Sequence, residues 1–469
     1  MRGRITLVAL GATLLASCSI GPNYQRPAIE APTAHRGPAS AAAATEGSSL
    51  GETPWPALFH DPEITKLVET ALKENFDIRM AAERIEQARA QYGIARSYLY
   101  PSVDASAKFT AQRSSSTGAN VFIKPGTNLD VSYTDVGGLF SWELDLWGRV
   151  RRLKEAARAQ YLSTEEARYG VQTALVADVT LAYLRLRELD LELEIAEKTR
   201  KIAEDGLRLT QLRRANGVAT GLDVRQAETL LYTATSQRAA TLRAIEQQEN
   251  AINFLLGGSP GTVPRGSALG EIVNPQAIPA GLPSNLLERR PDIRLAEQQL
   301  ISANAEIGIA KAQYFPRISL SSYVGGQSRA LSSLFTGPAR LWNFAPATTV
   351  PIFNAGRIRN DVRYSEAVQR EAELNYRKTV QNAFREVSDS LIAHGRLQEQ
   401  RKQQELLVGA LTESARLSNV RYRGGIDSFL QVLDAQRNLF SGELVLAQLQ
   451  LAELSSVVQL YRALGGGWQ

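Results

Sequence analysis

The chain carries one set of landmarks twice, and the second set lies 208 residues behind the first (148 to 356, 217 to 425, 257 to 465). Each landmark is a glycine in a matching context: Trp147–Val150 with Ala355–Ile358, Asn216–Leu222 with Gly424–Leu430, and Leu255–Gly258 with Ala463–Gly466. An upstream match, Gly93–Arg96 with Gly308–Lys311, has an offset of 215, so the intervening loops differ by seven residues. Constant spacing over this length predicts a duplicated supersecondary unit.

The N-terminus is typical of a secretory signal, predicted here over residues 1–17. Arg2 and Arg4 precede an apolar run that is too short for an ordinary membrane anchor. The run ends in Leu15-Ala16-Ser17-Cys18, which resembles the bacterial lipobox and implies a mature N-terminus at Cys18 carrying diacylglycerol and an N-linked acyl group such as palmitate. Cys18 is the only cysteine, so an internal disulfide is excluded. Cys18 is followed by Ser19 rather than by Asp, which resembles lipoproteins that are sorted to the outer membrane. Residues 18–54 are rich in Pro, Ala, Ser and Gly, which predicts a lipidated N-terminus and an extended tether.

Composition excludes several classes of protein. Beyond the N-terminus no apolar stretch reaches the roughly 18 residues of a spanning helix, so a multi-pass helical membrane protein is not expected. A net charge of +5 on 469 residues gives no support for nucleic-acid binding. The three histidines (His35, His60, His394) are far apart, and no HExxH, CxxC, Walker or GxSxG motif stands in a supportive context. We therefore expect no metal, no cofactor besides the lipid, and no enzyme activity.

Each repeat shows the same order of elements. Asp61-Pro62-Glu63 predicts a helix start, and that helix is expected to run to about Tyr98. Apolar and polar residues then alternate with period two, which predicts a strand hairpin at about 101–112 and 129–146, with a bulge or bend at Gly137-Gly138. The second copy predicts a helix at 291–313 and strands at about 316–326 and 341–353.

Two long helices follow the hairpins, at 148–215 and 356–423, and each would be about 100 Å long. Each is expected to stop at a glycine and to be followed by a returning helix that ends at Leu256 or Leu464. Thr220 with Asp223 and Ser428 with Gln431 resemble capping boxes. Heptad-like spacing of apolar residues predicts a packed stripe on the second long helix: Val380, Phe384, Val387 and Leu391. We expect a first repeat at 55–258, a linker at 259–284 and a second repeat at 285–469.

These elements, taken with local motifs, resemble the TolC family of outer-membrane efflux ducts, and in particular the OprM/NodT-type lipoproteins that serve RND multidrug pumps. The motifs span nearly the whole chain in order: Leu15–Cys18, Gly21–Tyr24, Trp142–Arg149, Arg289–Ile293, Pro351–Phe353, Arg421–Gly425, Leu433–Arg437 and Ala463–Trp468. The resemblance implies a mainly α fold with a membrane β part, built as a homotrimer. The predicted strands favour a trimer independently, because four strands cannot close a barrel in lipid. Three chains would supply twelve strands, above a long periplasmic α-barrel.

The resemblance also implies a function: the outer-membrane channel of a tripartite multidrug efflux system, with a role in antibiotic resistance. Its partners would be an inner-membrane RND pump, a periplasmic adaptor and outer-membrane lipid in a Gram-negative bacterium, with no nucleic acid. Two alternatives stay open. A coiled-coil adaptor or structural lipoprotein would not need the amphipathic hairpins. A type I secretion or metal-efflux duct would share the fold, although only two methionines give no support for copper or silver transfer.

By resemblance, the helix–turn–helix ends at 213–222 and 421–430 would hold a periplasmic gate. Asp427 and Asp434 are the gate candidates, with Arg421 and Tyr422 as possible latch partners. The plain alternative is a helix cap for Asp427 and a solvated helix residue for Asp434, since charge near a helix start is common.

Three tryptophans, Trp142, Trp147 and Trp342, are candidates for a membrane-interface belt. Ordinary packing at the junction of the sheet and the helices is the alternative for all three.

Overall fold

The structure is a computed structural model, and it describes residues 19–32, 35–37, 50–58, 61–115, 128–272 and 286–468. The chain divides into two compact units. Unit 1 comprises Met1–Pro27, Ile85–Ser163 and Ala296–Asn375, and unit 2 comprises Ala28–Arg84, Thr164–Leu295 and Tyr376–Gln469. The predicted signal peptide, Cys18 and His60 lie outside the described residues.

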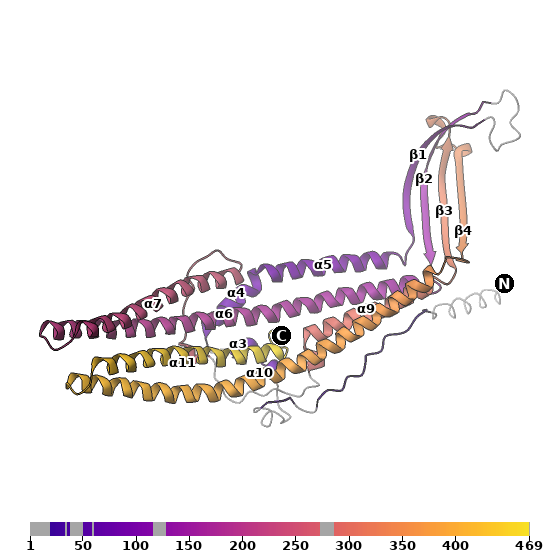
Figure 1. Ribbon diagram of the computed structural model, residues 1–469. Helices are drawn as coiled ribbons and strands as arrows, with labels where there is room; N and C mark the ends of the chain where they lie inside the picture. The colour runs from indigo at the N-terminus through magenta and orange to yellow at the C-terminus, as the bar shows by residue number, and fades with distance from the viewer. Residues whose placement is uncertain are drawn as a thin grey trace. The chain divides into compact units, whose positions relative to one another are not determined.

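The order of elements in the described residues repeats as the sequence predicts (Figure 1). The principal helices are α4 (Pro62–Glu74), α5 (Phe76–Ser97), α6 (Arg149–Ala215), α7 (Gly221–Leu255), α9 (Pro291–Ala312), α10 (Arg357–Arg423) and α11 (Phe429–Ala463). Short helices lie at η1 (Leu50–Glu52), α3 (Trp55–Leu58), η2 (Leu269–Glu271), α8 (Leu286–Arg289), η4 (Leu331–Ser333) and η5 (Gly337–Ala339). The strands are β1 (Ser102–Arg113), β2 (Asp130–Leu144), β3 (Arg317–Ser328) and β4 (Arg340–Thr349).

The repeated glycines mark the ends of these elements. All six have positive φ, at 80° and 83° for Gly148 and Gly356, 77° and 76° for Gly217 and Gly425, and 73° and 78° for Gly257 and Gly465. Gly217 illustrates the role: its N–H donates to Arg214 O and the next N–H donates to Arg213 O, which is a Schellman motif. A left-handed residue ends a helix cleanly, and only glycine adopts this conformation without steric cost. The constant 208-residue spacing is therefore a spacing of helix boundaries.

One predicted helix is interrupted. The helix expected from 62 to about 98 breaks at Asn75, whose backbone is extended (ψ 133°). The Asn75 side chain accepts hydrogen bonds from the N–H groups of Asp77 (2.7 Å) and Ile78 (3.2 Å), so it caps a new helix. Its amide also donates to Leu255 O at the end of α7 (2.8 Å). The break thus fastens α5 to the end of a neighbouring helix.

The capping box predicted in the first repeat is confirmed, and the one predicted in the second repeat is not formed. Thr220 and Asp223 form the expected capping box at the start of α7. Ser428 precedes α11 but its side chain makes no cap hydrogen bond, so the capping box predicted for Ser428 and Gln431 is wrong. Nearby, Asp427 is engaged by Arg421.

Unit 2 is a helical core with long-range packing between both repeats. Its fully buried side chains include residues of α4, α6, α7, α10 and α11: Ile64, Tyr183, Leu184, Leu186, Ile252, Leu391 and Leu460. The predicted stripe on α10 is confirmed, since Val380, Val387 and Leu391 are buried and Phe384 packs against the core. One sequence expectation is wrong: helix α11 is long and apolar enough to cross a membrane by length and composition. Half of that stretch is buried here, as in the core helix of a folded unit.

Unit 1 contains a four-stranded antiparallel sheet with order β1-β2-β3-β4, so the two hairpins lie side by side (Figure 1). The register is continuous, with Val103 opposite Phe140, Phe140 opposite Ser322, and Ser322 opposite Phe344. Because directly paired residues point to the same side, the register places most of the large apolar residues of the four strands on one face. That face, called the apolar face below, carries Val103, Ala107, Phe109, Val136, Phe140, Trp142, Ile318, Leu320, Val324, Trp342 and Phe344.

The opposite face, called the polar face below, carries serines, threonines and charged residues, together with Leu139, Tyr323 and Leu341. Asp104, Ser106 and Lys108 alternate with the apolar residues of β1, and Lys108 lies opposite Asp135. Asp135 accepts a hydrogen bond from Gln327 on β3 (2.6 Å). A hydrogen-bonded polar surface of this kind is suited to water rather than to lipid.

The glycine pair in β2 forms no bulge, so that prediction is wrong: Gly137 and Gly138 pair in unbroken register with Ser106 and Ala105. Gly137 instead lies beneath the ring of Tyr323 and opposite Gly325. A Cβ at Gly137 would come within 2.5 Å of Val324 O and 2.7 Å of the Tyr323 ring. The glycine is required by a close approach across the sheet.

We therefore expect Gly137→Ala to destabilise the sheet by about 1–3 kcal/mol, the usual cost of overpacking. Gly138→Ala is the matched control, because nothing in the described structure lies within 4 Å of a Cβ built there. Thermal unfolding of the two purified variants, followed by far-ultraviolet circular dichroism at strand wavelengths, measures the difference. Equal midpoints for the two variants would contradict the close-approach explanation.

Candidate functional site

The sequence Trp142–Arg149 forms the connection between β2 and α6 in unit 1. Asp145 caps the helix, accepting from the N–H groups of Val150 (3.0 Å) and Arg151 (2.9 Å). Glu143 receives two hydrogen bonds from Arg149 (2.8 and 2.9 Å) and an ion pair from Arg317 at the start of β3 (2.6 Å). The motif therefore fixes where the sheet ends and the helix begins.

The three candidate tryptophans occupy different positions in unit 1. Trp142 donates to Leu99 O (3.1 Å), and Trp147 donates to Pro316 O (2.8 Å) and packs against Phe315 with ring centroids 5.0 Å apart. Both rings are half-buried, whereas Trp342 on β4 is 78% exposed. Trp142 and Trp147 lie near the end of the sheet where α6 begins, and Trp342 pairs with Val324 further along the strands.

Residues 19–26, part of the predicted tether, are fastened to unit 1. The buried Arg152 of α6 donates to the carbonyls of Ile20 (3.2 Å) and Gly21 (3.3 Å) and to the side chain of Asn23 (2.8 Å). Ile20 N–H donates to Trp147 O (3.1 Å). Cys18 itself lies outside the described residues, but the chain that follows it is held beside the β2–α6 connection.

In unit 2, the α10–α11 hairpin brings two of the gate candidates together. Arg421 makes a bidentate ion pair with Asp427, with distances of 2.6 and 3.0 Å. The hydrogen bonds and charge of the Arg421 guanidinium hold the pKa of Asp427 below its ordinary value. The pair spans the turn between the last residues of α10 and the first of α11, and both side chains reach solvent.

Tyr422, the third candidate, is buried rather than free at the surface. Its ring packs against Phe429 (centroids 5.3 Å apart), and the Arg213 guanidinium of the α6–α7 hairpin lies 4.5 Å from its ring centre. Arg213 also donates to Tyr422 O (3.4 Å). This contact joins the ends of the two hairpins, so Tyr422 is positioned to couple them. A cavity of about 300 Å³ adjoins the same cluster.

Asp434, the fourth candidate, is exposed on α11, where Asn438 donates to it at 3.4 Å. It does not take part in the Arg421–Asp427 pair. Arg421, Tyr422 and Asp427 therefore lie together at the α10–α11 turn. Asp434 lies further along α11, outside this group.

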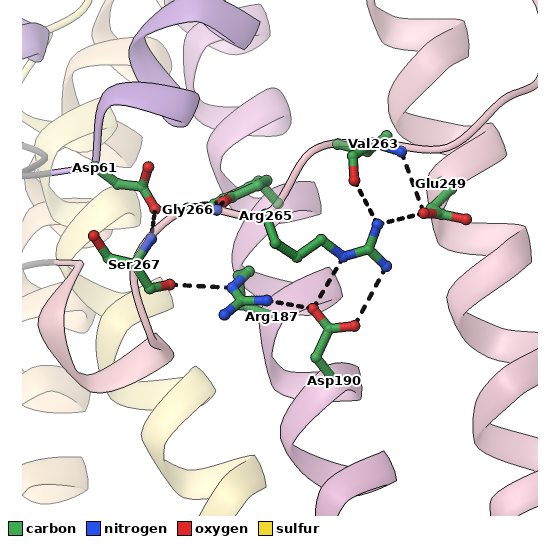
Figure 2. A network of polar contacts seen from close by, with 9 residues as sticks. Asp61, Arg187, Asp190, Glu249, Val263, Arg265, Gly266 and Ser267 are labelled. Carbon is green, nitrogen blue, oxygen red and sulfur yellow. Dashed lines mark hydrogen bonds and ion pairs between the residues drawn. The ribbon is translucent and has the colours of Figure 1, made fainter.

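Sequence reasoning missed a polar network inside unit 2, which Figure 2 shows. Arg265 contacts Asp190 of α6 (3.2 and 3.3 Å) and also hydrogen-bonds Glu249 of α7. Arg187 joins the same Asp190 to Ser267 O, and Ser267 N–H donates to the fully buried Asp61 (2.8 Å). The network binds the segment after α7 to α4, α6 and α7. No local sequence motif predicts this network, because its members lie up to 206 residues apart in the chain.

A second buried group, Glu188 of α6, has an unusual ionisation. The side chain is fully buried beside Glu192, and burial raises its pKa from the ordinary 4.5 to about 8, with Arg185 as its cationic partner. A raised pKa means that the folded protein holds a proton on this carboxyl up to a higher pH than the unfolded chain does.

Between about pH 4.5 and 8 the folded state binds more protons, so its stability should fall as pH rises. We expect Glu188→Gln to abolish this part of the pH dependence and to raise the unfolding midpoint at pH 8. Glu194→Gln, an exposed glutamate on the same helix, is the control. Thermal midpoints measured across that range would contradict the assignment if wild type and Glu188→Gln ran parallel.

Comparison with known proteins gives a consistent relationship over the whole length. The family described as "Outer membrane efflux protein" matches residues 67–258 and 282–466. The "Probable efflux pump outer membrane protein TtgC" of Pseudomonas putida is 41% identical, covering 98% of this chain and 95% of its own length. Outer membrane protein OprJ of Pseudomonas aeruginosa is 38% identical, covering 97% of this chain and 94% of its own.

The structural comparison agrees with the sequence comparison. The open state of the Neisseria gonorrhoeae MtrE outer membrane channel superposes with a TM-score of 0.85 at 32% identity, covering 96% of this chain and 99% of that one. The family match covers most of both repeats and places both hairpins and both long helices within one family fold. The chain therefore belongs to the outer membrane efflux protein family, whose members conduct rather than catalyse.

Proposed function

We propose that this protein is the outer-membrane conduit of a tripartite efflux system, passively carrying substrates that an inner-membrane RND pump and a periplasmic adaptor deliver. The sheet carries the proposal. Its apolar face carries most of the large aromatic and aliphatic residues of the four strands, and Val103, Phe109, Trp342 and Phe344 on that face are 58–78% exposed. Exposed apolar residues alternating with a polar face are the pattern of a membrane strand lining an aqueous lumen.

The same sheet supports a homotrimer. In the described chain β1 and β4 each pair on one side only, so each presents an unpaired edge. Unpaired backbone groups are not tolerated in hydrocarbon, so a membrane sheet must close on itself. Three copies joined β4 to β1 would close a twelve-stranded barrel, and the helices of the three chains would continue as an α-barrel in the periplasm.

The lipid anchor fits this placement. A diacylglycerol and an N-acyl chain on Cys18 would enter the membrane surface next to Trp147, because Ile20 is bonded there. Trp142 and Trp147 would then lie at the periplasmic interface, and Trp342 would face lipid further along the strands. Two or more acyl chains would hold the protein firmly to the outer membrane.

Arg421 and Asp427 are proposed as a latch at the periplasmic end, with Tyr422 linking the two hairpins. Their ion pair lies across the α10–α11 turn, and the Arg213–Tyr422 contact ties the neighbouring hairpin to it. In a trimer each element would appear three times around the axis, so small movements of one turn would act together. Asp434 would contribute negative charge to the same end rather than a latch.

Single-channel recording of the purified, detergent-extracted protein in a planar bilayer tests the conduit. We expect discrete openings, and a native mass of three chains. A protein that remains monomeric and never inserts would overturn the proposal and favour a coiled-coil adaptor instead. Copurification with an adaptor, tested separately, would distinguish an efflux duct from a secretion duct of the same fold.

A further inference from the structure

A second cavity lies in unit 1, where the sheet meets α6, α9 and α10. Its volume is about 370 Å³. Three arginines line it, Arg149, Arg317 and Arg357, together with the apolar residues Ile309, Phe315 and Pro316. A cavity of this size with convergent cationic groups on an apolar wall is the usual form of a small ligand site.

The carboxylates present do not saturate these guanidinium groups. Arg149 and Arg317 share the single carboxylate of Glu143, and the second acid of the cavity wall, Asp145, is already bonded to the backbone N–H groups at the start of α6. Arg357 bonds Asp361 (3.1 Å) and Gln313 (3.2 Å) through one nitrogen, Nη1. The Arg317 and Arg357 side chains are 66% and 63% exposed. A guanidinium has several N–H donors in a fork, so both arginines retain donors for an added anion.

The helix dipole does not favour arginine at these positions. Arg149 and Arg357 are equivalent in the two repeats, and each is the first residue of a 67-residue helix with no acid in its first turn. The helix dipole favours acidic residues there and disfavours basic ones. Each arginine has one acidic partner in the structure, Glu143 for Arg149 and Asp361 for Arg357, so an added anion would use their remaining donors.

The residues next to the cavity are apolar and exposed. Pro351 lines the cavity, and its neighbours Ile352 and Phe353 are 97% and 89% exposed. Trp342 and Phe344 continue this surface along the apolar face of β4. An occupant that joins an anionic group to hydrocarbon chains would meet both the guanidinium groups and this surface.

We propose that this cavity binds the phosphodiester headgroup of an anionic phospholipid, with Arg317 and Arg357 as the headgroup ligands and Ile352 and Phe353 against the acyl chains. The proposal rests on the membrane placement of the sheet given above. Arg149 would act mainly by holding Glu143 and so positioning Arg317. The bound lipid would hold the junction between the sheet and the helices at the level of the headgroups of the periplasmic leaflet.

Native mass spectrometry of the full-length protein in detergent, titrated with dihexanoyl-phosphatidylglycerol, tests the proposal. We expect the double variant Arg317→Gln, Arg357→Gln to bind the probe about tenfold more weakly, since charge-assisted bonds to phosphate are lost. The control is Arg113→Gln, Arg340→Gln, which removes the same charge at the opposite end of the same sheet. The control should bind as wild type does.

Several outcomes would overturn the proposal: unchanged affinity in the junction variant, an equal loss in the control, or equal binding of dihexanoyl-phosphatidylcholine by the wild type. Displacement of the probe by equimolar inorganic phosphate would assign the site to a free anion. Loss of the trimer mass in the junction variant would assign it to a subunit contact. Binding is measured without conduction, so a failure here is distinguishable from a failure of the conduit in the planar bilayer.

Discussion

Replacing Asp427 with alanine is expected to raise the resting open probability of the channel by about tenfold, because three modest ion pairs would be lost from one gate. In wild type, Arg421 holds the pKa of Asp427 below its ordinary value, so the pair stays charged at neutral pH. For a depressed carboxyl pKa, the stabilisation is present above the unfolded pKa and is lost as pH falls through the folded one. Wild type should therefore open on acidification only below the ordinary range of an aspartate, and Asp427→Ala should lose that transition.

The matched variants separate two kinds of gate in the same bilayer recordings. Arg421→Ala breaks the same ion pair, so a latch predicts that it opens the channel as Asp427→Ala does. If Asp427 instead faces the aqueous path as a fixed charge, the two variants should shift cation selectivity in opposite directions. Asp434→Ala removes an equal charge from α11 without touching the pair and should keep the wild-type open probability. Wild-type conductance and selectivity in Asp427→Ala would reject both forms of gate.

The boundaries of the helices and the faces of the strands could be predicted from the sequence, because they depend on residues that are close together in the chain. Gly217 and Gly425 end helices through their own left-handed conformation, and Thr220 with Asp223 caps α7 within three residues. The alternation in β1 and β3 gave the faces of the sheet, since a strand exposes one side chain in two to each face. Each of these features depends on a few consecutive residues, so a single sequence contains the information.

Features that depend on packing between distant residues were not accessible. Gly137 was expected to mark a bulge, but the ring of Tyr323, almost two hundred residues away, decides its identity. The helix break at Asn75 could not be predicted from the neighbouring residues, because the Asn75 side chain also donates to Leu255 O, 180 residues away. Tyr422 was expected, with Arg421, to be a latch partner, but nothing in the sequence indicated its burial against Phe429 and Arg213, which depends on contacts between two hairpins. The polar network of unit 2 belongs to the same class.

Within that network, Asp61→Ala is expected to cost about 3 kcal/mol of unfolding free energy. Asp61 is fully buried and accepts hydrogen bonds from the N–H groups of Glu63 (2.8 Å) and Ser267 (2.8 Å) and from the Tyr183 hydroxyl (3.3 Å). Alanine leaves these donors buried without that acceptor and also removes the cap of α4. Burial raises the pKa of Tyr183 to about 12, so its hydroxyl remains a donor at neutral pH.

Chemical unfolding in mixed micelles, followed by tryptophan fluorescence, measures this loss, with Asp77→Ala on the exposed first turn of α5 as control. The control should change stability by no more than about 0.5 kcal/mol. Asp61→Asn keeps one acceptor oxygen but places an amide donor against a backbone N–H, so it should fall between wild type and alanine. Equal midpoints for Asp61→Ala and Asp77→Ala would mean that the segment after α7 is held by its other anchor, the Arg265 contacts with Asp190 and Glu249. In that case Arg265→Ala should show the larger loss, because it would leave two carboxylates without their shared cation.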